Sequence, residues 1–439
     1  MELREPSARY LTGIKRTKRT ELGVLPSDWE IAEVGAISET ASGTTPPRSQ
    51  HERFYQRGVH AWVKTLDLNN AEIRITDESV TDRALQETSL RLFPAGSVLV
   101  AMYGGLRQIG RTGLLRIPAA VNQAITVVRP RPEALCPEFL LFYLNYRVGY
   151  WQSVASSSRK DPNITGADVR AFKLALPAVD EQQRIAAALA DADALIDSLE
   201  QQLTKKRQIK QGAMQELLTG KRRLPGFKGE WETVELRQLG HCVRGVTYNP
   251  STDLADGDGD QTVRLLRSNN VQASEIVFTG LQFVNRMRVR SDQYLQDGDL
   301  LLCMANGSRD LVGKAGRFLA EDEHRYTFGA FMGCYRPDTE VVDSAFVSFH
   351  LQTHAFRQHI DLLLAGSSIN NLRPEGVLSF LVNIPKDQTE QHAIAESLCD
   401  MTADIATIEA RLTKARALKQ AMAQALLTGR IRLVEPQQT

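Results

Sequence analysis

Two glycine-containing stretches place ligand-binding residue types at suggestive spacings. GSRDLVGKA, from Gly307, resembles a phosphate-binding loop, but it has one residue too many between its glycines and no Ser or Thr after Lys314. ADGDGDQT, from Ala255, resembles a calcium loop, but Gln261 stands where an EF-hand needs glycine. We therefore expect solvated loops here rather than nucleotide or calcium sites.

Histidines and nucleophile motifs offer no stronger candidate for catalysis. His350, His354 and His359 lie in a predicted helical stretch, where the first two would share a face, yet no Glu follows His350 as in zinc proteases. We interpret them as surface or half-buried side chains. The sequence contains neither Gly-x-Ser-x-Gly nor the Asn/Asp-Pro-Pro-aromatic tetrapeptide of amino-methyltransferases. We expect no active site, no metal and no cofactor in this chain.

Composition predicts an ordinary globular protein. The 439 residues are 42% hydrophobic and 24% charged, with 53 basic and 52 acidic side chains, and they are enough for more than one core. No apolar run approaches the length of a membrane span, and the first 20 residues lack the apolar core of a secretory signal. We expect a cytoplasmic protein without membrane contact. The five widely spaced cysteines are expected to be reduced: Cys136, Cys242, Cys303, Cys334 and Cys399.

The chain contains an internal duplication of about 200 residues. LPSDWE from Leu25 matches LPGFKGEWE from Leu224, and FPAGSVLVAM matches LQDGDLLLCM. EQQRIAAAL matches EQHAIAESL, and ELLTGKRRL matches ALLTGRIRL, both at an offset of 209 residues. Each repeat is therefore a domain followed by a segment of about 40 residues.

That segment has the spacing of a long amphipathic helix. Its apolar residues alternate at steps of four and three, which is a heptad pattern. The predicted seam comprises Ile185, Leu189, Ala192, Ile196, Leu199, Leu203, Ile209, Ala213 and Leu217 in the first helix, and Ile394, Leu398, Met401, Ile405, Ile408, Leu412, Leu418, Met422 and Leu426 in the second. A Pro precedes each helix, and Gly220 and Gly429 stand where each should end.

Charge order predicts how the two helices pair. Acidic residues fill the first half of each helix and basic residues the second half, which suits the helix dipole. An antiparallel pair would also place acid opposite base along the contact, so we predict an antiparallel coiled coil. Packing of each helix on its own domain alone is the alternative. About 38 helical residues would span roughly 57 Å.

The fold predicted from these features is α+β, with two homologous mixed α/β domains joined by the helix pair in a pseudo-two-fold arrangement. Short β-rich runs such as GSVLVAMY and GDLLLCMA alternate with turns, and 139–151 and 345–364 are expected to be helical. The predicted divisions are 1–177 for the first domain with an arm at about 1–20, 178–223 for the first helix, 224–385 for the second domain, 386–433 for the second helix, and 434–439 for a tail.

A rod that holds two related domains at a fixed separation is suited to reading DNA. A dimer-like protein contacts two half-sites along the duplex. The rod length corresponds to about 17 base pairs at about 3.4 Å each. Because the two domains differ in sequence, we expect two different half-sites. Residues 1–177 carry a net charge of about +5 and residues 225–385 about −5, so a basic face is expected more clearly in the first domain.

The repeated motifs resemble the specificity subunit of type I restriction-modification systems. The resemblance rests on LPSDWE and LPGFKGEWE, on LPAVDEQQRI and IPKDQTEQHAI, and on the two LLTG motifs, and it covers nearly all of 21–433. It implies a non-catalytic subunit with two target recognition domains, each reading one half of a split, asymmetric double-stranded DNA sequence. It implies helices that set the spacing and dock two methyltransferase subunits, which use S-adenosylmethionine. Restriction subunits that use ATP and Mg would complete the assembly.

The resemblance does not identify base-contacting residues, so we chose them by their chemistry on turn-rich loops. The first-domain candidates are Thr44, Thr45, Arg48, Lys64, Tyr103, Arg107, Gln108, Arg111, Asn122, Gln123, Ser157, Arg159 and Lys160. The second-domain candidates are Arg244, Tyr248, Arg267, Ser268, Asn269, Asn270, Asn306, Ser308, Arg309, Lys314, Arg325, Ser367 and Ser368. For each of them, a turn-forming residue or a surface charge is the alternative interpretation.

Three alternatives to the full assembly stay open at this point. A solitary methyltransferase is disfavoured by the missing motifs. The chain could instead be a protein-binding scaffold without DNA, or a subunit of a methyltransferase-only complex. The basic residues Lys15, Arg16, Lys18 and Arg19 form either a phosphate-binding arm or a solvated terminus.

Overall fold

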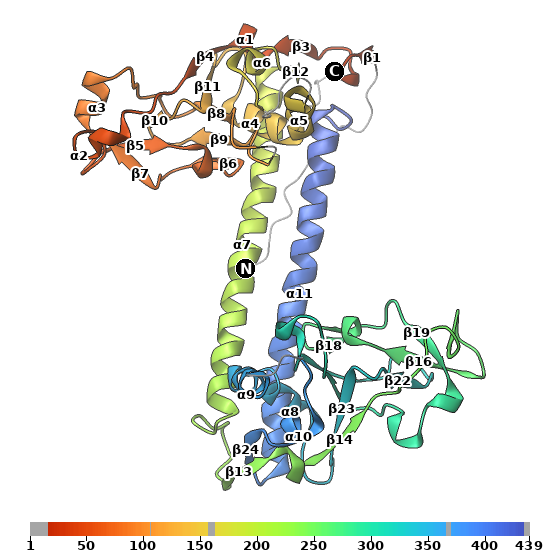
Figure 1. The fold of residues 1–439 in the computed structure, drawn as a ribbon. Helices are drawn as coiled ribbons and strands as arrows, with labels where there is room; N and C mark the ends of the chain where they lie inside the picture. The colour runs from red at the N-terminus through yellow and green to blue at the C-terminus, as the bar shows by residue number, and fades with distance from the viewer. Residues whose placement is uncertain (1–15, 106, 157–162, 366–369, 434–439) are drawn as a thin grey trace. The chain divides into compact units, whose positions relative to one another are not determined.

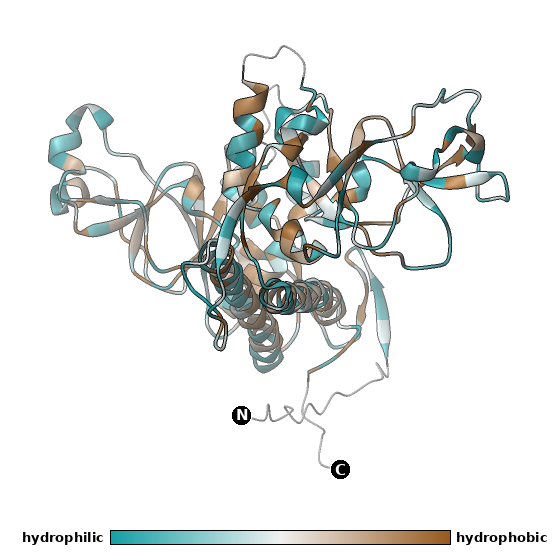
Figure 2. Cartoon of the chain, turned by 90° about the horizontal axis from the view of Figure 1, so that it is seen from below, coloured by the Kyte–Doolittle hydropathy of each residue, from teal (hydrophilic) through white to brown (hydrophobic). Residues whose placement is uncertain are grey.

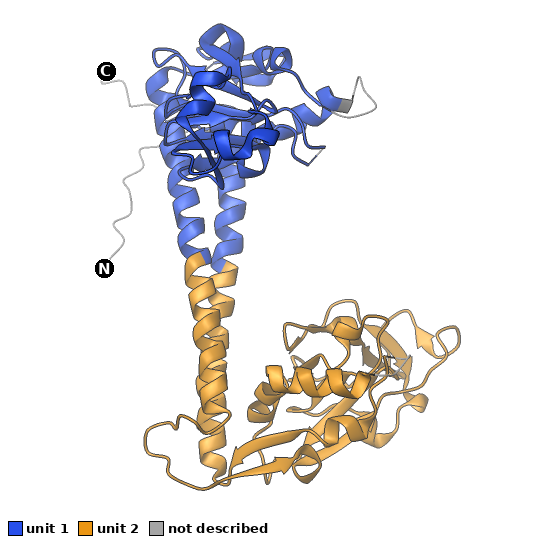
Figure 3. Ribbon diagram, turned by 60° about the vertical axis from the view of Figure 1, so that its left-hand side comes forward, with its two compact units in different colours: residues 1–200, 411–439 blue, residues 201–410 orange. Residues whose placement is uncertain are grey.

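The computed structural model describes residues 16–105, 107–156, 163–365 and 370–433. The chain divides into two compact units (Figure 3), which comprise residues 1–200 with 411–439, and residues 201–410. We call them unit 1 and unit 2. Both long helices continue from one unit into the other, so each unit holds a part of each helix.

The elements of the first repeat follow one another as labelled in Figure 1. They are β1 (Thr17–Thr20), β2 (Gly23–Pro26), β3 (Glu30–Glu33), α1 (Val34–Ile37), β4 (Ser38–Ser42), α2 (His51–Phe54), β5 (His60–Val63), β6 (Ala71–Ile73), β7 (Glu78–Val80), α3 (Asp82–Glu87), β8 (Val98–Ala101), β9 (Thr112–Leu115), β10 (Ala119–Val121), β11 (Ile125–Pro130), α4 (Pro137–Tyr146), α5 (Val148–Ser156), α6 (Gly166–Arg170), β12 (Lys173–Leu176) and α7 (Val179–Leu217).

The second repeat has a matching series of elements. They are β13 (Trp231–Glu235), β14 (Gly240–Arg244), β15 (Leu254–Ala255), β16 (Thr262–Leu266), β17 (Val271–Gln272), β18 (Glu275–Ile276), β19 (Gln282–Asn285), β20 (Leu300–Cys303), β21 (Ala315–Arg317), β22 (Tyr326–Phe328), β23 (Met332–Pro337), α8 (Ser344–His350), α9 (His354–Leu364), α10 (Pro374–Leu378), β24 (Leu381–Pro385) and α11 (Gln388–Leu427).

Two sheets carry the first domain. One has the strand order β4, β11, β8, β9, β6, and the other has the order β10, β5, β7, in which β5 and β10 are parallel. Every residue of β8 and β9 is buried, which explains why β8 reads as a continuous apolar run. Figure 2 shows such hydrophobic stretches along the strands and helices, with hydrophilic stretches in many connecting loops.

The second domain repeats this topology with different lengths. Its larger sheet has the order β14, β23, β20, β21, β18, β17, and its smaller sheet has the order β15, β19, β16, β22, with β16 and β22 parallel. Thus β14, β23, β20 and β21 correspond to β4, β11, β8 and β9, and the parallel pair recurs. The shared topology confirms the duplication predicted from the sequence.

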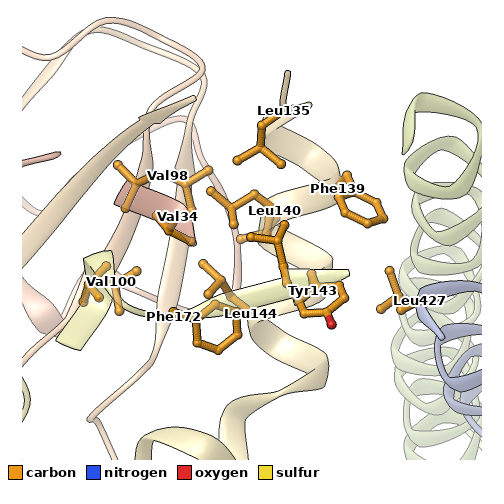
Figure 4. Packing of buried hydrophobic residues seen from close by; sticks show 14 of the residues in the cluster. Val34, Val98, Val100, Leu135, Phe139, Leu140, Tyr143, Leu144, Phe172 and Leu427 are labelled. Atoms are coloured by element: carbon orange, nitrogen blue, oxygen red, sulfur yellow. The ribbon is translucent and has the colours of Figure 1, made fainter. Parts of the chain in front are cut away.

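The core of each domain extends onto the long helices. In unit 1, Phe139 and Tyr143 of α4 belong to one buried cluster with Val98 of β8 and Leu427 of α11 (Figure 4). Ile185 and Leu189 of α7 join the same cluster, and in unit 2 the equivalent Ile394 and Leu398 of α11 join the core of the second domain. Burying each such side chain stabilises the fold by about 1.5–3 kcal/mol, so the domains hold the helix ends firmly.

Ion pairs show that α7 and α11 run antiparallel within unit 1. Arg416 Nη2 donates to Glu200 Oε1 at 2.6 Å, and Lys419 pairs with Asp193. The residue number rises along one helix as it falls along the other, which is the antiparallel order predicted from the charge gradient.

The same order holds in unit 2, with the acidic and basic partners exchanged between the helices. Arg207 Nη2 donates to Glu409 Oε1 at 2.5 Å, and Arg223, which follows α7, donates to Glu390 near the start of α11. Lys206 Nζ also donates to Asp404 Oδ2 at 2.7 Å. The pair Arg207 and Glu409 occupies the positions that correspond to Arg416 and Glu200 at the offset of 209 residues. Acidic first halves therefore face basic second halves in both units.

Most of the predicted seam is buried. The buried members are Ile185, Leu189, Ile196, Leu199, Leu203, Leu217, Ile394, Leu398, Ile408, Leu412 and Leu426, and Ile405 is half-buried. Ile209 and Leu418 are wrongly predicted, because their side chains are 47% and 56% exposed. Near these positions each helix turns its apolar face from its partner helix to a domain core, where Ala213 and Met422 pack.

The repeated Trp, Glu and Arg of the sequence motifs meet at one end of unit 1. Arg432 Nε and Nη2 donate to the two oxygens of Glu181 at 2.6 and 2.7 Å, and the guanidinium lies 5.6 Å from the Trp29 ring centroid. Trp29 Nε1 donates to Glu181 at 3.2 Å, and Asp28 also accepts from Arg432. Arg432, which follows α11, thereby binds Glu181 near the start of α7.

Unit 2 holds the equivalent cluster. Arg223 donates to both oxygens of Glu390 at 2.5 and 2.6 Å, and its guanidinium lies 5.5 Å from the Trp231 ring centroid. Glu181 and Glu390 are 1% and 0% exposed. The adjacent glutamines, Gln182 and Gln391, are also buried, and each accepts from a domain backbone N–H at 2.9 Å. The Glu-Gln dipeptides of the motifs are therefore structural.

The long helices occupy Val179–Leu217 and Gln388–Leu427, within the wider ranges predicted. Three sequence predictions need correction. The predicted helix 345–364 is two helices, because Thr353 caps α9, so His350 and His354 do not share a helical face. Likewise 139–151 divides between α4 and α5. The end of the predicted arm, Thr17–Thr20, is strand β1 paired with β2.

Candidate nucleic-acid interface

Ten of the first-domain candidates gather where the strands of unit 1 end. Lys64 follows β5, and Asn122 and Gln123 follow the parallel neighbour β10, so they emerge at the same edge. Backbone bonds join these loops, since Asn122 N donates to Val63 O at 3.0 Å and Thr44 N donates to Val121 O at 3.0 Å. We call residues 43–48, 64, 103–105, 107–111 and 122–123 loop cluster 1.

The loop between β8 and β9 completes loop cluster 1. Met102 N donates to Ala124 O at 2.8 Å, which places the following Tyr103 beside the Asn122–Gln123 turn. Tyr103 is 43% exposed, Arg107 is exposed, and Gln108 and Arg111 are half-buried. Arg111 Nε donates to Arg107 O, and this contact tightens the turn.

Internal bonds order several members of loop cluster 1. Thr45 Oγ1 donates to Gln123 Oε1, and Asn122 Oδ1 accepts from Ala124 N at 3.2 Å. The Thr44 hydroxyl lies 3.2 Å from Ser89 Oγ. Such bonds restrict side-chain rotamers, so the cluster presents its remaining donors and acceptors in a defined arrangement.

Glu78 neutralises part of the positive charge of loop cluster 1. Its carboxylate accepts from Arg48 Nη1 at 2.6 Å and from Lys64 Nζ at 2.7 Å. The hydrogen bond from Arg48, assisted by Lys64, lowers the pKa of Glu78 to about 2. Two predicted DNA-contacting cations therefore share one permanently ionised partner.

Unit 2 gathers its candidates at the corresponding strand ends. Arg267 follows β16 at the position equivalent to Lys64, and Gly329 N donates to Leu266 O at 3.0 Å. Met304 N donates to Phe331 O at 2.8 Å, which joins the loop after β20 to the turn after β22. We call residues 244–248, 267–270, 304–309, 314 and 329–331 loop cluster 2.

Several candidates of loop cluster 2 form hydrogen bonds with the backbone of the same unit. Asn270 is fully buried, accepts from Arg267 N, and donates to the carbonyls of residues 277 and 279. Arg244 donates to Leu372 O at 3.1 Å, and Arg309 donates to Asp361 O at 2.7 Å. Asn270 is thus a structural residue and is unsuited to contact bases.

Other candidates lie elsewhere. Arg325 precedes β22, at the edge opposite loop cluster 2, where its guanidinium lies 5.6 Å from the Tyr294 ring centroid. The structure therefore does not join Arg325 to the other candidates. Exposed or half-buried Tyr248, Ser268, Asn269, Asn306, Ser308 and Lys314 do lie in loop cluster 2. Five candidates fall outside the described residues: Ser157, Arg159, Lys160, Ser367 and Ser368.

Some residues of these clusters were missed by the sequence analysis. Phe331 is 72% exposed in the turn that corresponds to Asn122–Gln123, and its backbone oxygen accepts two hydrogen bonds. Tyr55, Trp62 and Glu78 lie directly around Arg48. Phe331, which directly precedes β23, could have been noticed in the sequence FMGCYRP, but nothing local in the sequence marks Glu78.

The described residues contain no group of three or more His, Cys, Asp or Glu side chains that could hold a metal ion. Within the same residues, no helix is long and apolar enough to cross a membrane.

His350 is buried, and burial lowers its pKa to about 4. In the calcium-like loop, the Asp258 side chain pairs with Arg264.

Comparison with known families gives an independent assignment of both repeats. Residues 26–211 and 228–416 each match the family described as type I restriction modification DNA specificity domain. The chain belongs to this specificity family. The two matches fall on the two repeats, in agreement with the duplicated topology.

Individual members of the specificity family align with one repeat or with both. The MjaVIII specificity subunit of Methanocaldococcus jannaschii is 23% identical over 430 residues, which cover 93% of this chain and 94% of that protein. The EcoKI specificity subunit of Escherichia coli is 31% identical over 203 residues, which cover 46% of this chain and 42% of that protein. The match to the StySPI subunit of Salmonella potsdam likewise spans 42% of its length. The chain thus spans less than half the length of these two relatives.

A solved specificity subunit shares the fold. The S subunit of a type I restriction-modification system from M. genitalium superposes with a TM-score of 0.59 at 12% identity, covering 91% of this chain and 96% of that one. Sequence identity is low, so the likeness concerns the arrangement of elements. It agrees with the mixed α/β domains and long helices predicted from the sequence.

Proposed function

We propose that this chain is the DNA-reading specificity subunit of a type I restriction-modification complex. Each domain reads one half of a bipartite, asymmetric double-stranded DNA target. The observation that carries the proposal is the repetition of one strand-end loop cluster in two units whose sequences both match the specificity family. This chain contributes recognition and no catalytic step.

Different side chains at equivalent positions support two different half-sites. Loop cluster 1 offers Lys64 and Gln123 where loop cluster 2 offers Arg267 and Ala330. Arginine suits guanine, and Asn or Gln suits adenine, through paired hydrogen bonds in the major groove. Hydroxyls and main-chain amides of the same loops suit phosphates, which position the protein without specifying sequence.

The long helices support the remaining parts of the proposal. We propose that α7 and α11 fix the spacing of the half-sites and dock two methyltransferase subunits on exposed faces that include Ile209 and Leu418. The methyltransferase subunits supply S-adenosylmethionine chemistry. Restriction subunits supply the activity that uses ATP and Mg. The complex acts in the cytoplasm.

Binding by the assembled complex tests this proposal. The chain is combined with its methyltransferase subunits, and binding to duplexes is followed by gel shift as the salt concentration rises. We expect sequence-selective, bipartite binding that weakens steeply with salt. Selective binding and methylation without any restriction subunit encoded nearby would indicate a methyltransferase-only complex. Absence of DNA binding together with assembly of protein partners would instead establish a protein scaffold.

A further inference from the structure

Arg48 is held in one orientation on the surface of loop cluster 1. Its guanidinium carbon lies 4.4 Å from the Tyr55 ring centroid and 4.9 Å from the Trp62 ring centroid. Both rings are nearly fully buried, whereas the Arg48 side chain is 46% exposed. Two aromatic faces thus support a guanidinium that still reaches solvent.

The two rings are themselves tied to the loop that carries Arg48. Tyr55 donates its hydroxyl hydrogen to Pro46 O at 2.6 Å, and Trp62 Nε1 donates to Thr44 O at 3.4 Å. The rings also contact one another edge to face at 5.4 Å. Backbone and side chain of Arg48 are therefore fixed by the same pair of aromatic residues.

Glu78 places an acceptor beside this fixed donor. Its Oε2 accepts from Arg48 Nη1 at 2.6 Å and its Oε1 accepts from Lys64 Nζ at 2.7 Å, and the carboxylate side chain is 32% exposed. Arginine has five N–H donors, so most of them stay free for a ligand, and each carboxylate oxygen has a second lone pair. The surface therefore presents a forked donor followed by an acceptor.

This order matches one edge of a base pair. In the major groove a G·C pair presents guanine N7 and O6 as acceptors, followed by the cytosine N4 amino group as donor. We propose, on the basis of the DNA-reading function proposed above, that Arg48 and Glu78 together read one G·C pair of the half-site bound by the first domain. Arg48 donates to guanine N7 and O6, and Glu78 accepts from cytosine N4.

A phosphate contact for Arg48 is disfavoured by the same geometry. The Glu78 carboxylate is in direct contact with the guanidinium and would repel a phosphate group. A backbone contact also needs no fixed plane, whereas recognition of a base edge does. Lys64, whose flexible ammonium group also neutralises Glu78, completes a cluster with a net charge of +1.

The test probes the base atoms that Arg48 and Glu78 would contact. The methyltransferase complex is assembled with the chain, and 7-deazaguanine, which lacks N7, replaces each target guanine in turn. We expect the complex to lose about 5- to 150-fold in affinity when the guanine read by Arg48 is changed. With Arg48→Ala, which has no donor for guanine N7, the unmodified duplex should bind more weakly and the 7-deazaguanine replacement at that one position should have no further effect.

A second probe addresses Glu78, and a matched arginine serves as control. N4-methylcytosine in the same base pair should weaken binding by the unaltered protein but not by Glu78→Ala, which has no acceptor for the amino group. Arg53 is the control, because it is half exposed, pairs with Glu87 and contacts the Phe54 ring outside loop cluster 1. Arg53→Ala should retain the full sensitivity to both analogues, and thermal melting of each variant checks that it is folded.

The outcomes separate this inference from the proposed function. If Arg48→Ala retains the full 7-deazaguanine sensitivity at every position, or loses affinity equally on all sequences, the inference is overturned. Retention of the N4-methylcytosine effect in Glu78→Ala would remove the role of Glu78 even if that of Arg48 stands. If the unaltered complex binds no sequence selectively, the proposed function fails and not the assignment of Arg48 alone.

Discussion

Arg432 donates to both carboxylate oxygens of Glu181, a residue 251 positions earlier in the chain. The pair joins the end of the second repeat to the start of the first helix, and both residues belong to unit 1. Because Arg223 and Glu390 form the equivalent pair in unit 2, each domain is completed by a helix end that belongs to the other repeat. This exchange explains why both repeats share one motif at their start and another at their end.

Removal of Arg432 should strongly destabilise unit 1. Arg432→Ala leaves Glu181, which is 1% exposed, without its cationic partner, so we expect a loss of about 3–5 kcal/mol in the free energy of unfolding. The measurement is urea unfolding of the full chain, with exposed Arg430→Ala as the matched control. Equal midpoints for the two variants would show that the Glu181 pair is not important for stability.

The glycine that ends α11 should tolerate no side chain. Gly429 has φ +68°, and an added Cβ would lie 2.5 Å from Pro26. Gly429→Ala combines strain with a clash, so it should cost about 1–3 kcal/mol more than a change with strain alone. Gly280 is the control, because its φ is +63° and nothing lies within 4 Å of an added Cβ. Similar melting temperatures for the two alanine variants would contradict this packing.

Stability should fall in mild acid because of His350. Burial lowers the pKa of His350 to about 4, below the value of about 6.5 in the unfolded chain, so protonation favours unfolding. The loss should accumulate as the pH falls from about 6.5 to about 4 and reach roughly 3 kcal/mol. Carboxylates titrate over part of this range, so the difference from His350→Phe isolates the histidine. Parallel stability curves for the two proteins would refute the effect.

Sequence patterns predicted the helices better than the site, because heptads and repeats can be read directly from the order of the residues. Ile185 and Leu412 are buried, as expected for the apolar face of each helix, whereas Ile209 and Leu418 are exposed where the helices turn to the domain cores. Loop cluster 1 could be anticipated from turn residues after apolar runs. The burial of Asn270 could not, because a buried and an exposed asparagine turn look alike in sequence.

Insertion of one heptad into both helices should widen the gap between the half-sites. Seven residues lengthen a helix by about 10.5 Å and preserve the seam, which corresponds to about three base pairs. Insertions after residues 200 and 410 avoid both domain cores. The spacer of the target is read by sequencing methylated DNA from cells that carry the variant complex. An unchanged spacer would show that helix length does not set it.

The most direct test of divided recognition is an exchange of one domain. Residues 1–177 are replaced by the equivalent domain of another family member, and the methylated sites of the resulting complex are mapped across a genome. We expect one half of the target to change while the other half stays the same. A target that is unchanged, or altered in both halves, would show that the two domains do not each read one half.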